Sequence, residues 1–372
     1  VPVTYKVLTT TEGSKTVQVG NGTVQAIPKS TSGTLTIPDS AVYFDEKFEV
    51  VAMANYAIKN CNELKVLHLP NTISSLGLQS VYECSLLQEV NIPNQLENTG
   101  QYNFAYMNKL KSINMPSSVK YLNYGTFAFN PVMEEITGWN PSQLERVGII
   151  NWYYNSPMYS NTDYFQTEDG YRYMGDVLIN MPDDDESITV KEGTRIVVGN
   201  SSSKTTCKSI EFPASITALS SGVLFSFPLL ETCTIKALPP TVVYCAYDVA
   251  TDKDATGLRE YGASCYPQYG GNPTPENVKY YVPKSAIATY KADDKWNMLN
   301  LCPIGGWTIT FVANGETLSE QQVEQGEMPV EPTPDTYYTA EHMYVFDHWD
   351  ATVVPATEDV TYTAVYSEQQ LP

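Results

Sequence analysis

Cations are scarce in this chain, and their scarcity limits what it can bind. Among 372 residues there are 22 Lys and Arg against 42 Asp and Glu, which gives a net charge of −20. Residues 307–372 contain twelve acidic residues and no Lys or Arg, and the other −8 is spread over residues 1–306. Because phosphate groups are bound by clustered cations, the sequence argues against a nucleic acid partner. It argues equally against an anionic membrane surface.

Histidines and long apolar runs are also scarce. The three histidines are His68, His342 and His348, and no two of them stand at metal-ligand spacing. Where two acidic residues are adjacent in an extended segment, their side chains point to opposite faces of the strand, which is poor geometry for a catalytic pair of carboxyl groups. We therefore predict no catalytic residue, no metal site, no cofactor and no enzyme activity. No stretch approaches the ~20 apolar residues of a membrane span, so we expect no membrane insertion within this chain.

What the chain does contain is a 23-residue repeat. Pro70, Pro93 and Pro116 are 23 residues apart. Three apolar columns keep the same step: Leu64, Leu87, Leu110 and Met133; Ile58, Val81, Phe104 and Phe127; and Leu67, Val90, Ile113 and Ile136. A period between 20 and 29 residues with such columns is typical of a leucine-rich repeat solenoid. We predict a mainly β (α/β) solenoid with short helical or 3-10 turns.

Each repeat can be divided into a strand, a stop and a turn. A triplet such as Val90-Asn91-Ile92 alternates apolar and polar residues with period two, which predicts a short strand. The following proline ends the strand because it cannot donate to a ladder. The middle stretch, such as residues 102–106, is expected to form one helical or 3-10 turn on the opposite side. One rung cannot bury its own apolar face, so the rungs must stack.

The repeat defines the expected domains. Residues 1–306 are assigned to the solenoid, with an N-terminal cap at 1–34 and a C-terminal cap at 240–306. Residues 159–206 are an irregular insertion, for which we expect β-hairpins in line with the stack. Residues 307–372 are predicted to form a separate small β-rich domain.

Four smaller features mark the edges of these parts. A nine-residue insertion after Pro38 delays the next repeat. In the C-terminal cap, Ser285 is expected to cap a short helix at 286–290, and Trp296 to close the core. The glycine pair at 305–306 is interpreted as a hinge, and Asn314-Gly315 as a hairpin turn.

The seven cysteines fall into two groups. Cys61, Cys84, Cys207 and Cys233 occupy repeat columns and are interpreted as small buried hydrophobic residues. Cys245, Cys265 and Cys302 lie outside the clear repeats, and a bridge between Cys245 and Cys265 stays open because sequence alone cannot pair them. The acidic segment 252–257 begins like a calcium loop but lacks the glutamate at its twelfth position, which favours a solvated turn over a calcium site.

Two candidate binding surfaces remain. The first is a polar strip formed by the middle residues of the strand triplets, weighed against the ordinary wet face of a sheet: Thr36, His68, Asn91, Asn114, Thr137, Thr189, Glu211 and Thr234. The second is an aromatic cluster that can anchor a protein or stack on a sugar, weighed against core filling: Trp139, Trp152, Tyr153, Tyr154 and Tyr159.

The repeat units resemble the BspA-type leucine-rich repeats of Bacteroides-like surface proteins. The resemblance rests on Leu69-Pro70, on Phe104-Ala105 and Phe127-Ala128, and on the Cys61/Cys84 and Leu64/Leu87 columns. Residues 309–315 and 346–364 are similar to the Listeria–Bacteroides B-repeat, which implies a compact β-grasp-like fold for the C-terminal domain. Both families imply a secreted or surface-anchored protein, with any signal or anchor segment outside this chain.

These observations favour a non-enzymatic binding or adhesion protein that recognises a host or cell-surface protein, or a glycan. Two alternatives stay open. One is a structural spacer that presents another domain and has no ligand of its own. The other, a carbohydrate-active enzyme, is disfavoured because no acid pair is placed for it.

Overall fold

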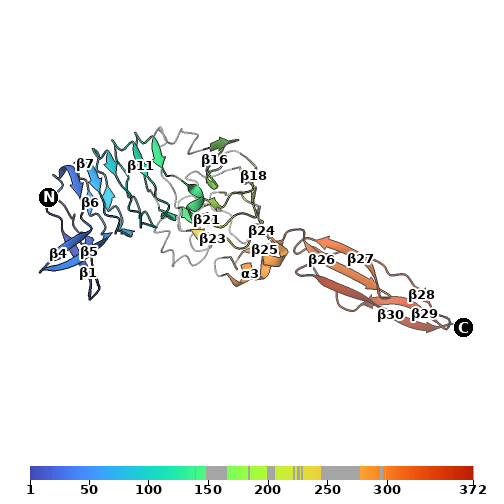
Figure 1. The fold of residues 1–372 in the computed structure, drawn as a ribbon. Coiled ribbons are helices and arrows are strands. Elements are labelled where there is room, and N and C mark those ends of the chain that lie inside the picture. The colour runs from blue at the N-terminus through green and yellow to red at the C-terminus, as the bar shows by residue number, and fades with distance from the viewer. Residues whose placement is uncertain are drawn as a thin grey trace.

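The computed structural model describes residues 1–371 except 124, 139, 148–165, 183–184, 199–205, 221–222, 224–226, 228, 244–276, 294–295 and 298. Short strands stack one behind another from the N-terminus to the helix α3 (Ile287–Ala292), and longer strands continue beyond them to the C-terminus (Figure 1). The mainly β, leucine-rich-repeat type of fold predicted from the repeat is confirmed.

The strand triplets form parallel ladders, as their alternation predicts. We call these strands the triplet row: β3 (Ser32–Thr36), β7 (Glu63–His68), β10 (Glu89–Val90), β11 (Ser112–Asn114), β13 (Glu135–Thr137), β18 (Ser187–Thr189), β20 (Ser209–Phe212), β22 (Thr232–Ile235), β24 (Lys279–Val282) and β25 (Asn300–Pro303). They pair in three successive parallel sheets. Ile113 lies opposite Ile136, and Ile210 lies opposite Cys233. Residues of one sequence column are therefore paired with one another across the sheets.

Two further rows of strands belong to the stack, and the third row is present in its first rungs. The second row contains β5 (Glu46–Met53), β8 (Ser75–Leu76), β12 (Tyr121–Leu122), β14 (Arg146–Val147), β17 (Val177–Asn180), β19 (Ile196–Val197), β21 (Ala218–Ser220) and β23 (Thr241–Val243). The third row contains β6 (Ile58–Lys59) and β9 (Val81–Tyr82), and a bridge from Tyr82 to Ala105 extends it by one rung.

The expected helical turn at residues 102–106 is wrong in its local detail. Tyr102, Phe104 and Tyr106 have positive φ angles of 52°, 59° and 58°. The Phe104 amide donates to the Val81 carbonyl of the preceding rung at 2.9 Å, and the Tyr106 amide donates to the Ala128 carbonyl of the next at 3.0 Å. Because these amides bond along the stack, they are not available to close a turn within one rung.

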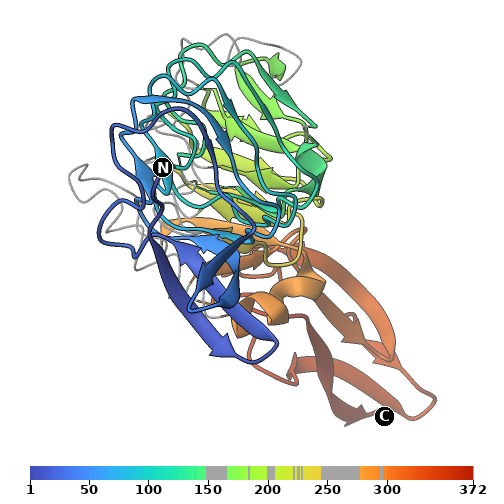
Figure 2. The same cartoon turned by 60° about the vertical axis from the view of Figure 1, so that its left-hand side comes forward.

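The N-terminal end of the stack is covered by two hairpins. β1 (Tyr5–Thr11) and β2 (Ser14–Val19) pair antiparallel, and β2 then runs parallel to β5. β4 (Ser40–Tyr43) pairs antiparallel with β5, which gives the order β1-β2-β5-β4. The nine-residue insertion after Pro38 thus builds β4, its turn and the start of β5. Both hairpins extend from the same end of the stack (Figures 1 and 2).

The irregular insertion contains the hairpins that were predicted for it. β15 (Gln166–Glu168), β16 (Tyr171–Met174) and β17 pair antiparallel in succession, and β17 then joins the second row through β19. A single 3-10 turn, η1 (Pro141–Gln143), precedes β14. The hairpins therefore remain in line with the stack.

The C-terminal cap closes the core, but not with the predicted helix cap. Ser285 lies inside the 3-10 turn η4 (Lys284–Ala286), and α3 begins after Ala286 with no side-chain cap. Because η4 runs directly into α3, Ser285 is already within helical backbone and cannot occupy the cap position. Trp296 is buried as predicted, and its Nε1 donates to the Pro240 carbonyl at 3.2 Å.

The last strands form a separate five-stranded sheet in the order β27-β26-β30-β29-β28. Their bounds are β26 (Trp307–Ala313), β27 (Glu316–Val323), β28 (Tyr337–Tyr338), β29 (His342–Trp349) and β30 (Val360–Gln370). Asn314 and Gly315 form the predicted turn, with φ angles of 49° and 79°. The similarity of this segment to the B-repeat stays a prediction.

The predicted columns share one interior. Leu64, Leu87 and Leu110 are fully buried and belong to the same apolar cluster. The four cysteines of the repeat columns are fully buried as well: Cys61, Cys84, Cys207 and Cys233. Asn130, which stands in the column of Cys61 and Cys84, lies in this interior as well, and so does Asn103, which the apolar pattern did not predict.

Candidate binding surfaces

The polar strip predicted from the triplets is brought together by the parallel register. Thr36 lies opposite His68, and Asn114 lies opposite Thr137. Thr189, Glu211 and Thr234 follow one another on β18, β20 and β22. Thr36, His68, Asn114, Thr137 and Thr189 are exposed, whereas Asn91, Glu211 and Thr234 are half-buried. The structure therefore aligns these residues along one face, and their role in binding stays a prediction.

Part of this strip is already engaged within the fold. The Asn91 amide accepts from the Leu69 backbone N–H at 2.7 Å and donates to the Leu69 carbonyl at 2.8 Å. Asn114 Nδ2 donates to Thr137 Oγ1 at 3.3 Å. A ligand at Asn91 would compete with two backbone bonds, so the more available groups are Thr36 and His68.

Charged side chains beside the strip are paired between rungs. Lys111 lies 3.0 Å from Glu134, Lys208 lies 3.5 Å from Glu186, and Lys236 lies 2.6 Å from Glu211. Exposed pairs of this kind contribute little stability but fix which charges a partner meets. The strip is therefore largely a neutral, hydroxyl- and amide-bearing surface.

The predicted aromatic cluster lies outside the described residues: Trp139, Trp152, Tyr153, Tyr154 and Tyr159. The same is true of Cys245, Cys265 and the segment 252–257 that begins like a calcium loop. Cys302 is a buried free thiol, and burial raises its pKa.

A different set of aromatic side chains forms a surface that the sequence analysis missed. We call it the aromatic ladder: Tyr56, Tyr82, Tyr102, Tyr106 and Phe129, all half-buried beside the third row. The rings of Tyr106 and Phe129 stack with centroids 4.5 Å apart, and those of Tyr82 and Tyr106 meet edge-on at 5.3 Å. Lys59 Nζ lies 4.9 Å from the centroid of the Tyr82 ring. The 23-residue spacing of Tyr106 and Phe129 was the available signal.

Burial also changes the ionisation of this ladder. The pKa of Tyr82 is raised to about 12, first by burial and then by the neighbouring Tyr106 and Glu83. Tyr82 therefore stays neutral at ordinary pH, with the Lys59 cation over its ring. Half-exposed aromatic side chains with a cation nearby are suited to protein or sugar contacts.

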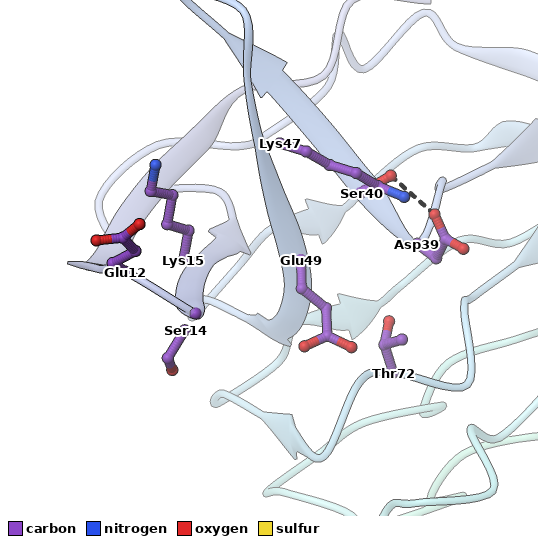
Figure 3. Close-up of a pocket in the computed structure, with 9 residues that line it drawn as sticks. Glu12, Ser14, Lys15, Asp39, Ser40, Lys47, Glu49 and Thr72 are labelled. Atoms are coloured by element: carbon purple, nitrogen blue, oxygen red, sulfur yellow. Dashed lines mark hydrogen bonds between the residues drawn. The ribbon is translucent and has the colours of Figure 1, made fainter.

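A cleft lies beside the N-terminal hairpins (Figure 3). Its volume is about 420 Å³, and it is lined by the β1–β2 turn, by β4 and β5, and by Thr72 of the next rung. Glu12, Asp39 and Glu49 supply carboxylates, and Lys15 and Lys47 supply cations. Ser40 Oγ donates to Asp39 Oδ1 at 2.9 Å. This polar, mixed-charge cleft comes from the hairpins rather than from the repeats, so no repeat pattern predicted it.

The histidines of the C-terminal sheet pair with nearby carboxylates. His348 Nδ1 lies 3.1 Å from Asp347 Oδ2, and His342 Nδ1 lies 3.5 Å from Glu368 Oε1. Over the described residues, no group of three or more His, Cys, Asp or Glu is placed to hold a metal ion. No helix in the same part of the chain has both the length and the apolar character needed to cross a membrane.

Comparison with known proteins identifies the repeat. Six copies of the BspA type leucine rich repeat region match residues 40–155. No curated protein is found to match the chain.

Several solved structures are similar. The pneumococcal vaccine antigen PcpA is 17% identical, with a TM-score of 0.39, over 82% of this chain and 96% of that one. A leucine-rich repeat protein from Bacteroides ovatus is 16% identical, with a TM-score of 0.33, over 76% of this chain and 70% of that one. A leucine rich cell surface protein from Faecalibacterium prausnitzii is 14% identical, with a TM-score of 0.31, over 63% of this chain and 77% of that one.

Proposed function

We propose that this chain, whose residues 40–155 belong to the BspA-type leucine-rich repeats, is a secreted or cell-surface binding protein without enzymatic activity. Its ligand is a protein or glycan of another cell or of its matrix. The observation that carries the proposal is the aligned triplet row, which repeats small hydroxyl and amide groups at the spacing of adjacent strands, about 4.8 Å. A row of this kind makes many weak contacts with an extended partner rather than one deep contact.

The aromatic ladder supports the same function from another side of the rung. Half-exposed rings contribute most of the energy of many interfaces, because they bury large areas with few rotatable bonds. The ladder holds Tyr106 and Phe129 in a stacked arrangement before any ligand arrives. Binding would therefore combine a polar row with an aromatic patch.

The proposal divides the chain into a binding part, residues 1–306, and a second domain, residues 307–372. The change at Trp307 from short parallel strands to a sheet of longer, mainly antiparallel strands supports that division. The second domain would act as a spacer or second contact, and its similarity to the B-repeat is consistent with that role.

The test is an array of glycans and matrix proteins incubated with the whole chain and with two matched variants. Thr137→Arg places a large cation on the exposed polar strip, and Ser75→Arg places the same group at an exposed position of the second row. We expect Thr137→Arg to lower binding to the captured ligand at least tenfold and Ser75→Arg to leave it unchanged.

Deletion of the segment containing Trp152 to Tyr159 separates recognition from a spacer role. Lost binding favours recognition through the aromatic residues. If the whole chain binds nothing on the array, or if all variants bind equally, the strip has no recognition role and the spacer alternative stands.

A further inference from the structure

The tip of the β4–β5 hairpin exposes three apolar side chains in a row. Val42, Tyr43 and Phe44 are 73%, 61% and 82% exposed. They lie in the nine-residue insertion that interrupts an otherwise regular repeat. The base of the insertion contributes to the cover of the N-terminal end, where Ala41 packs against the core, but these three side chains at its tip do not.

The backbone of this tip is unfavourable for the residue it carries. Tyr43 pairs with Glu46, which leaves Phe44 and Asp45 as a two-residue turn with φ angles of 48° and 63°. Such a turn favours Asn-Gly, and a bulky aromatic residue at positive φ is a genuine outlier. The ring contact of Phe44 is with its neighbour Tyr43, edge-on at a centroid distance of 4.3 Å. The side chain of Phe44 is thus held in a strained position where it serves no packing in the described fold.

The base of the hairpin is firmly held. Phe48 and Val50 are buried in the core, and the Val50 amide donates to the Asp39 carbonyl at 2.8 Å. Lys15 of the neighbouring hairpin pairs with Glu46 at 2.7 Å. Because the hairpin is ordered before binding, docking its tip loses little conformational entropy.

The charge around the tip indicates the chemistry of its partner. Residues 39–49 contain four carboxylates, Asp39, Asp45, Glu46 and Glu49, against two nearby cations, Lys47 and the Lys15 that pairs with Glu46. Val42 pairs with Lys47 and Ser40 with Glu49, so Val42 shares a face of the hairpin with Ser40, which lines the cleft.

We infer that this tip is a docking site for a protein segment that presents apolar side chains, such as Leu or Phe, next to Lys or Arg. Phe44 and Tyr43 pack on those apolar side chains, and a partner cation reaches the cleft beside Val42. An anionic membrane surface and a second copy of this chain, with its net charge of −20, are both repelled by the same carboxylates. The site is separate from the polar strip, and the two can be tested independently.

The experiment uses an array of immobilised 15-residue peptides that vary in apolar content and in net charge. The whole chain is compared with the variant Tyr43→Thr/Phe44→Asn, in which asparagine suits the turn. The matched control is Tyr338→Thr, which removes an equally exposed tyrosine from β28. Thermal unfolding shows that the variants are folded, and we expect the tip variant to be at least as stable as the parent.

We expect the parent chain and Tyr338→Thr to retain peptides that combine Leu or Phe with Lys or Arg, and the tip variant to bind them at least tenfold more weakly. Raising the salt to about 1 M should weaken retention, because exposed charges are then screened beyond ~3 Å.

Four results would overturn the inference. They are no retained peptide with the parent chain, equal retention by the tip variant, equal retention of acidic apolar peptides, and a tip-dependent association with anionic vesicles or between copies in sedimentation.

Discussion

The buried amide of Asn103 joins two rungs and provides a direct test of how the stack is held together. Its Oδ1 accepts from the Ser80 hydroxyl at 2.9 Å and from the Val81 backbone N–H at 3.0 Å. Its Nδ2 donates to the carbonyls of Gly77 at 2.9 Å and Thr99 at 3.0 Å. The side chain is fully buried, so no water can replace these partners directly in the folded protein.

The substitution Asn103→Ala removes all four bonds at once. With a net contribution of about 1 kcal/mol for each bond, we expect the free energy of unfolding to fall by about 4 kcal/mol. Asn130 makes two such bonds, from the Met107 N–H to its Oδ1 at 2.7 Å and from its Nδ2 to the Phe104 carbonyl at 2.8 Å. Asn130→Ala should therefore lower the free energy of unfolding by about 2 kcal/mol.

Asn71→Ala is the control, since this exposed side chain accepts one bond, from the Asn94 amide at 3.1 Å. We expect a loss of about 0.5 kcal/mol or less there, because water replaces an exposed partner.

The measurement is urea unfolding of the whole chain, with hydrogen exchange of the Val81 amide as a local probe. Equilibrium unfolding gives the change in stability if the dependence of the free energy of unfolding on urea concentration has the same slope in all variants. Hydrogen exchange is needed because stacked repeats can open locally before the whole array unfolds. If Asn103→Ala loses no more stability than Asn71→Ala, or if Val81 exchanges at the parent rate, the buried amide is not a link between rungs.

Three other perturbations test separate parts of the fold. Leu87→Ala empties a fully buried column position and should lower the free energy of unfolding by about 2–5 kcal/mol in the same urea assay. Gly306→Ala should lower the thermal midpoint, because a Cβ there would lie 2.8 Å from the Val323 carbonyl oxygen at a φ of 78°. Tyr82, with its pKa raised to about 12 chiefly by burial, should ionise late in a titration followed by tyrosinate absorbance. Since the pKa of Tyr82 in the unfolded chain is near 10, the neutral side chain adds stability below pH 10, and this stability is lost as the pH rises through about 12. In the variant Tyr82→Phe, the free energy of unfolding should fall less over this pH range.

The stack was predictable because its apolar columns repeat with a fixed step. A parallel register needs only that equivalent residues lie opposite one another, and Ile113 opposite Ile136 follows from their spacing of 23. The burial of Asn103 was not predictable in this way. Asn130 occupies the column of Cys61 and Cys84, so the repeat places it inside, but the pattern of apolar residues does not indicate its hydrogen-bond partners.

The third row was also hidden from the sequence. Positive φ angles at Tyr102, Phe104 and Tyr106 contradict the ordinary preference of aromatic residues, and in this conformation the Phe104 and Tyr106 amides bond to adjacent rungs. Those bonds depend on the stack having formed, so no property of residues 102–106 alone indicates them. The same dependence explains why the aromatic ladder was missed.

The candidate surfaces differ in how they arise from the sequence. The polar strip follows from the repeat, yet the register that aligns it also engages part of it, as the two bonds of Asn91 to Leu69 show. The side chains of an insertion are not engaged in this way, because the neighbouring rung has no equivalent residues with which they could bond. Phe44 is strained and exposed in the described fold, and the rung does not need it. The base of the β4–β5 hairpin covers the end of the stack, but its exposed tip packs on no rung, which makes the tip the first of the two sites to test.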